Sequence, residues 1–232
     1  MKSTFRSLFS VALLLFTAVF LTSCFEVREE FDIKSDGSGS YKFVLDMSQI
    51  GAMMKGMQES LPDSAKQEDP TSQLGNVNGV KFESVNEIKG ISNAVEINDK
   101  DNYIFGGQFD FANIEALNKA LSLISKDSTT GDMPPGIYSF SKGTFARKWH
   151  EQYFVDKVFG NRDENVGMGG GAEMEQILSK VQYKCIIRTG GKIKKYAKNK
   201  VKMTSPTEVV YEYQLFDMKK NVEDLKFFVK FK

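Results

Sequence analysis

The stretch FEVREEFDIKSDGSGSYKFVLD, residues 25–46, determines the fold expected for this chain. Val27 and Phe31 alternate with charged residues, which is typical of a strand with one buried face. Glycine-rich turn residues follow at 35–39, and a second alternating run begins at Tyr41. The sequence therefore predicts a β-hairpin over 25–46.

Beyond the hairpin, the chain alternates between helical and strand periodicity. Helices are predicted over 48–61, 114–124, 174–178 and 219–223. Strands are predicted near 80–88, 94–97, 103–111, 137–140, 144–149, 181–187, 192–202, 209–216 and 225–231. Gly106 and Gly107 inside one of them indicate a bulge or a close backbone approach. Tight turns and few long crossovers favour an α+β domain over 24–232, with an antiparallel, curved β-sheet and two to four helices packed on one face.

The N-terminal 24 residues have the layout of an export signal. Lys2 and Arg6 precede an apolar run over 8–21, which leads into Leu21-Thr22-Ser23-Cys24. This motif resembles a bacterial lipobox, which implies that residues 1–23 are a lipoprotein signal peptide and that Cys24 becomes the acylated N-terminus. The alternative is a transmembrane helix, because no charge occurs between Arg6 and Glu26. The residues after Cys24 are acidic and strand-like, which favours the lipoprotein.

The net charge of the mature domain argues against one class of partner, nucleic acid. The precursor has a formal charge of +1, and removal of Lys2 and Arg6 changes it to −1. A nearly neutral exported domain is not expected to bind nucleic acid. Since Cys24 would be acylated, Cys185 has no partner and is predicted to be a buried structural thiol.

Residues that could support catalysis are scarce. His150 is the only histidine, so a histidine triad or a multi-histidine metal site has little to build on. Adjacent carboxylates such as Glu29 and Glu30 usually decorate a solvated face. The sequence therefore predicts no enzyme, no metal and no cofactor, and an enzyme that relies on carboxylates alone stays an alternative.

A basic stretch over 192–202 is predicted as one strand. Alternation places five lysines on one face of it, namely Lys192, Lys194, Lys198, Lys200 and Lys202. Such a face could contact anionic headgroups of a membrane. The alternative is an exposed edge strand that lysines protect against pairing with other chains.

Aromatic and methionine side chains suggest an apolar ligand site. The chain contains 19 phenylalanines, and the helix over 48–61 carries three methionines on one face. Methionine is adaptable and suits surfaces that accept varied apolar ligands. We predict a cavity between this helix and the sheet, lined by Met53, Met54, Met57, Phe43, Phe109 and Phe227. Ordinary close-packed core is the alternative.

The motif Cys24-Phe25-Glu26-Val27-Arg28-Glu29-Glu30-Phe31, with Asp36-Gly37-Ser38-Gly39 and Asp46-Met47-Ser48, resembles envelope lipoproteins of the Bacteroidetes type. More distantly, it is similar to the LppM-like lipoprotein domain. That resemblance implies an α+β domain with an apolar cavity and glycolipid binding, and no catalytic residues. The function expected is that of a lipid-anchored, non-catalytic envelope protein that binds a lipid or other apolar ligand. The alternative is a structural or assembly partner of another envelope protein. By the lipoprotein sorting rule, Phe25 rather than aspartate after the cysteine favours the outer membrane. Its periplasmic side is expected, because Glu26 is isolated from Glu29-Glu30 and resembles a surface-export signal poorly, and the cell surface is the alternative.

Overall fold

The computed structural model describes residues 26–49, 51, 82–126, 136–148, 181–197, 201–214 and 226–232. In chain order, its elements are β1 (Glu26–Ile33), β2 (Gly39–Asp46), the 3-10 helix η4 (Phe82–Glu87), β3 (Ile91–Asp99), β4 (Ile104–Phe111), α4 (Ile114–Lys126), β5 (Tyr138–Ser141), β6 (Thr144–Arg147), β7 (Gln182–Thr189), β8 (Ile193–Tyr196), β9 (Val201–Ser205), β10 (Glu208–Gln214) and β11 (Phe227–Phe231). Within the described residues, no helix has the length and apolar character needed to cross a membrane.

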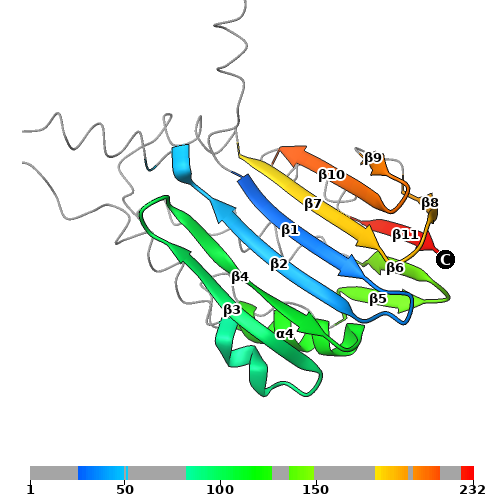
Figure 1. The fold of residues 1–232 in the computed structure, drawn as a ribbon, viewed down its shortest axis with the longest axis horizontal. Helices are drawn as coiled ribbons and strands as arrows, with labels where there is room; N and C mark the ends of the chain where they lie inside the picture. Colours follow the sequence, from blue (N-terminus) through cyan, green and yellow to red (C-terminus); the bar gives the residue numbers. More distant parts are fainter. Residues whose placement is uncertain are drawn as a thin grey trace, which may run out of the picture.

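The strands form two sheets rather than the single sheet expected from the sequence (Figure 1). Sheet A has seven strands in the order β3-β4-β2-β1-β7-β10-β9, and sheet B has four in the order β5-β6-β11-β8. The chain passes from sheet A to sheet B at Gly190-Gly191. A side chain at Gly191 would place its Cβ 1.4 Å from the carbonyl oxygen of Lys232, so only glycine fits where the two sheets meet.

The predicted hairpin is confirmed. β1 and β2 are antiparallel, with Glu26 opposite Asp46 and Ile33 opposite Gly39. The expectation of a wholly antiparallel sheet is wrong at one place, because β1 and β7 are parallel. The hairpin occupies one side of β1 and leaves its other side open, and a strand arriving after a long connection can enter there in either direction.

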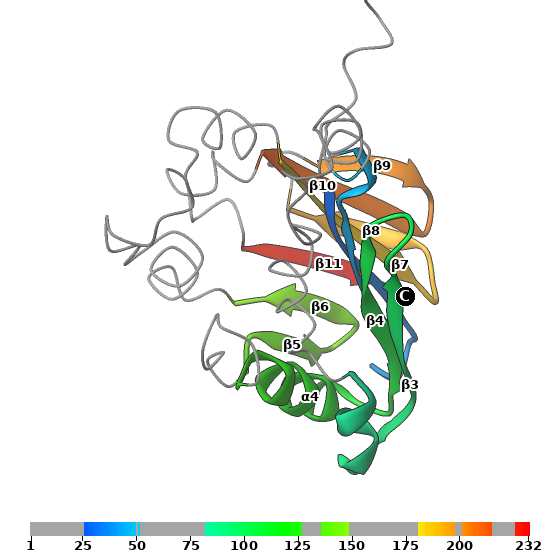
Figure 2. The same cartoon turned by 90° about the vertical axis from the view of Figure 1, so that its left-hand side faces the viewer.

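One α-helix belongs to the second layer. Figure 2 shows α4 beside the strands of sheet B, with both facing sheet A. Its apolar stripe is buried, as the sequence predicted, and includes Ile114, Leu117 and Leu121. The side-chain amide of Asn118 donates to the Tyr138 carbonyl at 2.9 Å and accepts from the Tyr138 N–H at 3.0 Å. These two bonds satisfy backbone groups on the outer edge of β5. α4 therefore packs beside the β5 edge of sheet B.

The other predicted helices lie outside the described residues, apart from the first residues of the helix over 48–61. The strand expected near 80–88 is wrong, because residues 82–87 form the 3-10 helix η4. Phe82 and Val85 are both buried, and a spacing of three residues places them on one side of a 3-10 turn. Their burial explains the apolar residues that suggested a strand. A Cβ at Gly107 would lie 2.1 Å from the Phe82 ring, which confirms the close approach expected at this glycine.

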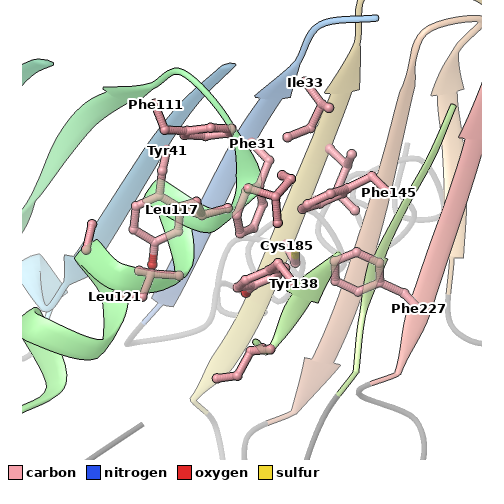
Figure 3. Packing of buried hydrophobic residues seen from close by; sticks show 14 of the residues in the cluster. Phe31, Ile33, Tyr41, Phe111, Leu117, Leu121, Tyr138, Phe145, Cys185 and Phe227 are labelled. Atoms are coloured by element: carbon pink, nitrogen blue, oxygen red, sulfur yellow. The ribbon is translucent and has the colours of Figure 1, made fainter. Parts of the chain in front are cut away.

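Aromatic residues from both layers fill the core (Figure 3). Phe31 of sheet A has ring centroids of three neighbours within 5.3 Å, those of Tyr41, Tyr138 and Phe145. Tyr138 and Phe145 come from sheet B and stack almost in parallel. Pairs of this kind stabilise a core beyond the burial of their area, so the aromatic contacts join the two sheets.

Candidate functional site: a buried charge cluster and the end of sheet A next to Cys24

A buried ion pair joins the two sheets. Glu29 lies on β1 between Val27 and Phe31, on the face that packs against sheet B. Arg147 is the last residue of β6, and its side chain is 1% exposed, against 13% for that of Glu29. The Arg147 Nη1 atom lies 3.1 Å from the Glu29 Oε2 atom. Each sheet therefore contributes one charge to the interior.

Two tyrosines complete the hydrogen bonding of this carboxylate. Tyr41 on β2 donates its hydroxyl to Glu29 Oε1 at 2.9 Å. Tyr183 on β7 donates its hydroxyl to Glu29 Oε2 and accepts from Arg147 Nη1 at 2.6 Å. The Arg147 guanidinium also lies over the Phe227 ring, 4.6 Å from its centroid. A buried ion pair is tolerated when further hydrogen bonds compensate the loss of water, and the strand neighbours of Glu29 supply them.

Burial keeps the uncharged members of the cluster protonated. It raises the pKa of the Tyr41, Tyr138 and Tyr183 hydroxyls well above the ordinary value. Burial likewise raises the pKa of the Cys185 thiol to about 12. A reactive cysteine needs its thiolate, so Cys185 in this setting is a structural thiol, as the sequence predicted. Tyr41 and Tyr183 act as hydrogen-bond donors to Glu29.

The cluster includes a permanent cation. Burial by itself would lower the pKa of the Arg147 guanidinium, but neighbouring tyrosines, Cys185 and Glu29 more than offset that effect and raise it. A fixed cation, a carboxylate and protonated hydroxyls thus meet inside the core and join β1, β2, β6 and β7. Buried polar groups can specify a unique packing in this way.

Sequence reasoning missed both charged members of this cluster. Glu29 was placed on a solvated face together with Glu30, but it shares its side of β1 with Val27 and Phe31. Arg147 shares its side of β6 with Phe145, which is fully buried. The signal was available, because period-two alternation assigns both residues to buried faces. Opposite charges at buried positions of two strands indicate an internal ion pair.

A smaller apolar cluster lies at the end of sheet A where β1 begins. Cys24 itself is outside the described residues, and β1 starts two residues after it at Glu26. The buried members of this cluster are Leu45, Met47, Tyr103 and Phe105, with the half-buried Val27 and Phe43 packed against them. Leu45 lies opposite Val27 in the register of the hairpin. The cluster therefore adjoins the predicted anchor.

The residues predicted to line a ligand cavity are only partly brought together. Met53, Met54 and Met57 lie outside the described residues. Phe109 and Phe227 are 1% and 3% exposed and belong to the main core. Phe227 lies on sheet B instead of the sheet face that carries Phe43. Phe43 is half-buried and packs against both the main core and the smaller cluster.

The predicted lysine face is divided between the sheets. The stretch over 192–202 is two strands, because β8 is an edge of sheet B and β9 is an edge of sheet A. Lys192 and Lys194 belong to the sheet B side, whereas Lys202 lies on β9 and pairs with Glu212 at 2.7 Å. Lys198 and Lys200 lie outside the described residues. The single face of five lysines is therefore wrong, because a strand-length alternation cannot reveal that the chain changes sheets.

Among the described residues, no group of three or more histidine, cysteine, aspartate or glutamate side chains is arranged to hold a metal ion. No protein-family model matches the chain. A search of curated proteins also found no match. Among solved structures, the chain is weakly similar to the folded domain of LppM from Mycobacterium tuberculosis, determined by NMR, with a TM-score of 0.40 and 10% sequence identity over 90% of each chain.

Proposed function

We propose that this chain is a lipid-anchored, non-catalytic protein of the bacterial cell envelope, and that it binds a lipid or other apolar ligand beside its anchor. The observation that carries the proposal is the position of the smaller apolar cluster. It lies at the end of sheet A from which β1 leads back to Cys24, only two residues before Glu26. An acyl chain on Cys24 would hold this end of the domain at the bilayer.

The anchor follows from the lipobox-like sequence and gains support from the start of β1. Two residues of extended chain span at most about 7 Å. A central strand of the sheet would thus begin almost at the membrane surface. One acyl chain binds a membrane only marginally, whereas two or more hold it stably, so a triacylated Cys24 would keep the domain in place.

A non-catalytic role is supported by where the polar side chains lie. Glu29, Arg147 and Tyr183 bond to one another in the interior between the two sheets. General acid–base catalysis needs a group within hydrogen-bond reach of a substrate. In this cluster the hydrogen-bonding capacity is directed at other members of the cluster.

The apolar ligand site is assigned to the half-buried Phe43 and its neighbours. Phe43 packs against the smaller apolar cluster. A Cβ at Gly51 would lie 1.9 Å from the Tyr103 ring, so the chain that leads to Met53, Met54 and Met57 leaves from this same cluster. Adaptable thioethers and aromatic rings are suited to an apolar ligand.

Two measurements test the proposal on protein purified from membranes. Mass spectrometry of the N-terminal peptide should detect an acylated Cys24, and extraction with organic solvent should release a copurified lipid. Met54→Trp should reduce uptake of a hydrophobic fluorescent probe while the protein stays folded. Phe140→Leu, which changes an aromatic side chain beside Phe231 in sheet B, is the matched control. A mature protein that starts elsewhere would contradict the anchor, and a parent protein that takes up no probe would contradict the ligand.

Location in the envelope has its own test. We propose the outer membrane, since Phe25 rather than aspartate follows Cys24, and its periplasmic side, since the isolated Glu26 resembles a surface-export signal poorly. Membrane fractionation should then recover the protein with the outer membrane, and protease added to intact cells should leave it uncut. Rapid cleavage on intact cells would instead indicate the cell surface.

An assembly role is the second candidate, and the edges of sheet A favour it. Val95 on β3 and Met203 on β9 are the exposed large apolar side chains among the described residues, each 45% exposed. They lie on the two edge strands of sheet A, where an unpaired backbone can accept a strand from another protein. Chemical crosslinking in cells should capture a stable partner through Val95→Cys or Met203→Cys if this role is correct, and the same positions should give only background if it is not.

A further inference from the structure

Sheet B differs from sheet A because all the charged side chains among its described residues are positive. Its strands and their described flanks cover residues 136–148, 192–197 and 226–232, and these ranges contain no aspartate or glutamate. Apart from the buried Arg147, every charged side chain in them is an exposed lysine. The strands of sheet A, in contrast, carry acidic residues on β1, β2, β3, β4 and β10. The absence of acid is therefore a property of one sheet.

The lysines gather toward the outer face and the far end of sheet B. Six of the eight exposed lysines in these ranges form this group: Lys142, Lys192, Lys194, Lys195, Lys230 and Lys232. Lys230 lies directly opposite Lys195 in the register of β11 and β8. The backbone N–H of Lys232 donates to the carbonyl of Lys192 at 3.3 Å. Like charges opposite each other on neighbouring strands are destabilising, and no acidic side chain among the described residues of the sheet relieves them.

We propose that this lysine face, defined by the six lysines above, docks on the anionic surface of the membrane that holds Cys24. The inference rests on the proposed anchor. A leash of two residues keeps the domain in contact with the bilayer, so some surface of the domain must face the headgroups. Each lysine close to an anionic bilayer contributes about 1 kcal/mol, and the tether provides a high effective concentration of lipid.

Charge selects which surface of the domain turns toward the bilayer. The end of sheet A nearest the anchor carries Glu26 directly opposite Asp46, Asp99 ends β3 there, and Asp101 lies in the turn that follows. These carboxylates oppose a flat contact between this end and anionic headgroups, although the leash keeps it close to them. Sheet B has no acidic side chain among its described residues, so charge favours an orientation in which the domain lies over on its leash and the lysine face meets the headgroups.

A membrane fits this face better than an acidic protein or a linear polyanion. A bilayer is a broad and uniformly negative surface, which disfavours every acidic residue that faces it. The lysines are spread over two strands and three turns or strand ends, whereas a linear polymer favours charges along one track. Phe228 lies among them, half-buried on β11, with the Lys195 Nζ atom 5.8 Å from its ring centroid. Aromatic rings beside lysines are typical of membrane interfaces.

The test uses the acylated full chain reconstituted into vesicles, with an environment-sensitive fluorophore on a single introduced cysteine. Ser141→Cys places it on the outer face of sheet B, and Ser40→Cys places it on the outer face of sheet A as the matched control. Cys185 is fully buried and does not react, and an acylated Cys24 has no free thiol. Labelling of Cys24, or failure to float with the vesicles, would show that the anchor is wrong before the face is tested.

In vesicles of equal parts phosphatidylglycerol and phosphatidylcholine, emission from position 141 should shift to the blue and that from position 40 should not. Pure phosphatidylcholine, or about 0.5 M salt, should abolish the shift because screening is then strong. Lys195→Glu with Lys230→Glu should lower the docked fraction at least about tenfold, whereas Lys42→Glu with Lys184→Glu on sheet A should leave it unchanged. The proposal is overturned if position 141 stays aqueous in anionic vesicles that hold the protein, or if its signal responds only to an added acidic protein or polyanion.

Discussion

Sheets A and B enclose one core but differ in how their charged side chains are arranged. The outer face of sheet A carries mixed ion pairs, such as Arg188 with Glu30 at 2.9 Å and with Glu208 at 2.8 Å. Sheet B has only cations among its described residues, and it uses one of them, Arg147, to reach the carboxylate of Glu29 in sheet A. The sheets thus differ in the arrangement of their charges: cations and anions pair on the outer face of sheet A, whereas the lysines of sheet B are exposed and its Arg147 points inward to sheet A.

The largest expected effect comes from removing one partner of the ion pair between the two sheets. Arg147→Met should reduce the free energy of unfolding by about 3–5 kcal/mol, because it leaves the Glu29 carboxylate buried without its ion partner. Arg188→Met, on the half-exposed side chain in sheet A, should cost only about 1 kcal/mol or less. Chemical denaturation of both variants measures the difference.

A double variant gives the control for this prediction. Glu29→Leu with Arg147→Met should recover most of the stability lost by Arg147→Met alone, since a buried pair can often be replaced by apolar residues. Equal losses for Arg147→Met and Arg188→Met would contradict the contrast between an internal and a surface charge.

The interior and the edge of sheet A should differ strongly in thiol reactivity. Burial raises the pKa of Cys185 to about 12, so at pH 8 its modification should be slower than that of an exposed thiol by on the order of a thousandfold. Met203→Cys on the edge strand β9 provides the exposed thiol for comparison, in a background where Cys24 is acylated. Rapid labelling of Cys185 in the folded protein would show that the layers open far more readily than their packing indicates.

Removing one hydroxyl tests how far the tyrosines support the ion pair. Tyr183→Phe should cost about 1–3 kcal/mol, because the hydroxyl bonds both Glu29 and Arg147 in the interior. Tyr211→Phe is the matched control on the neighbouring strand, since the Tyr211 hydroxyl has a long contact of 3.5 Å to the Phe228 carbonyl. Thermal unfolding of the two variants should therefore separate them, and identical midpoints would exclude a special role for Tyr183.

The smallest expected effect is the loss of stability at low pH that comes from Glu208 on the outer face of sheet A. Hydrogen bonds from Thr204 and Arg188 lower the pKa of Glu208 from its ordinary value of 4.5. The folded state then binds fewer protons than the unfolded state, so this group stabilises the protein above about pH 4.5 and the contribution is lost as the pH falls through the lower folded value. The loss should be below about 1 kcal/mol.

Comparing the unfolding free energies of the parent and Glu208→Gln at pH 7 and at pH 3 measures this contribution. The advantage of the parent at pH 7 should disappear at pH 3. Hydrogen exchange should also increase in β9 and β10 before β6 and β11, because Glu208 on β10 accepts a hydrogen bond from Thr204 on β9. Simultaneous loss of protection in both sheets would contradict this order.

Local patterns in the sequence predicted local structure well. The hairpin of β1 and β2 depends on alternation and a turn within 25–46, and α4 depends on a stripe within a single helix. Both signals lie in short windows, and both elements are confirmed. The 3-10 helix η4 was mistaken for a strand because Phe82 and Val85 are apolar at a spacing that several structures share.

The pairing of distant segments could not be read in the same way. Nothing within 192–202 indicates that β8 joins sheet B and β9 joins sheet A, since that outcome depends on which strand edges are open elsewhere. The Glu29–Arg147 pair connects positions 118 residues apart. The alternation places Glu29 and Arg147 each on a buried face. That they pair with each other depends on how the two sheets pack.

The parallel pairing of β1 with β7 has a consequence for how the molecule is made. β1 is the first described strand to be synthesised, yet Tyr183, which bonds Glu29 beside it, lies 154 residues later. Contacts between such distant segments slow folding, because the loop between them must close before they form. Until β7 emerges, one edge of the β1–β2 hairpin stays unpaired and open to aggregation. We therefore expect the nascent chain to need a chaperone over most of its length, and truncation before residue 182 to yield an insoluble protein.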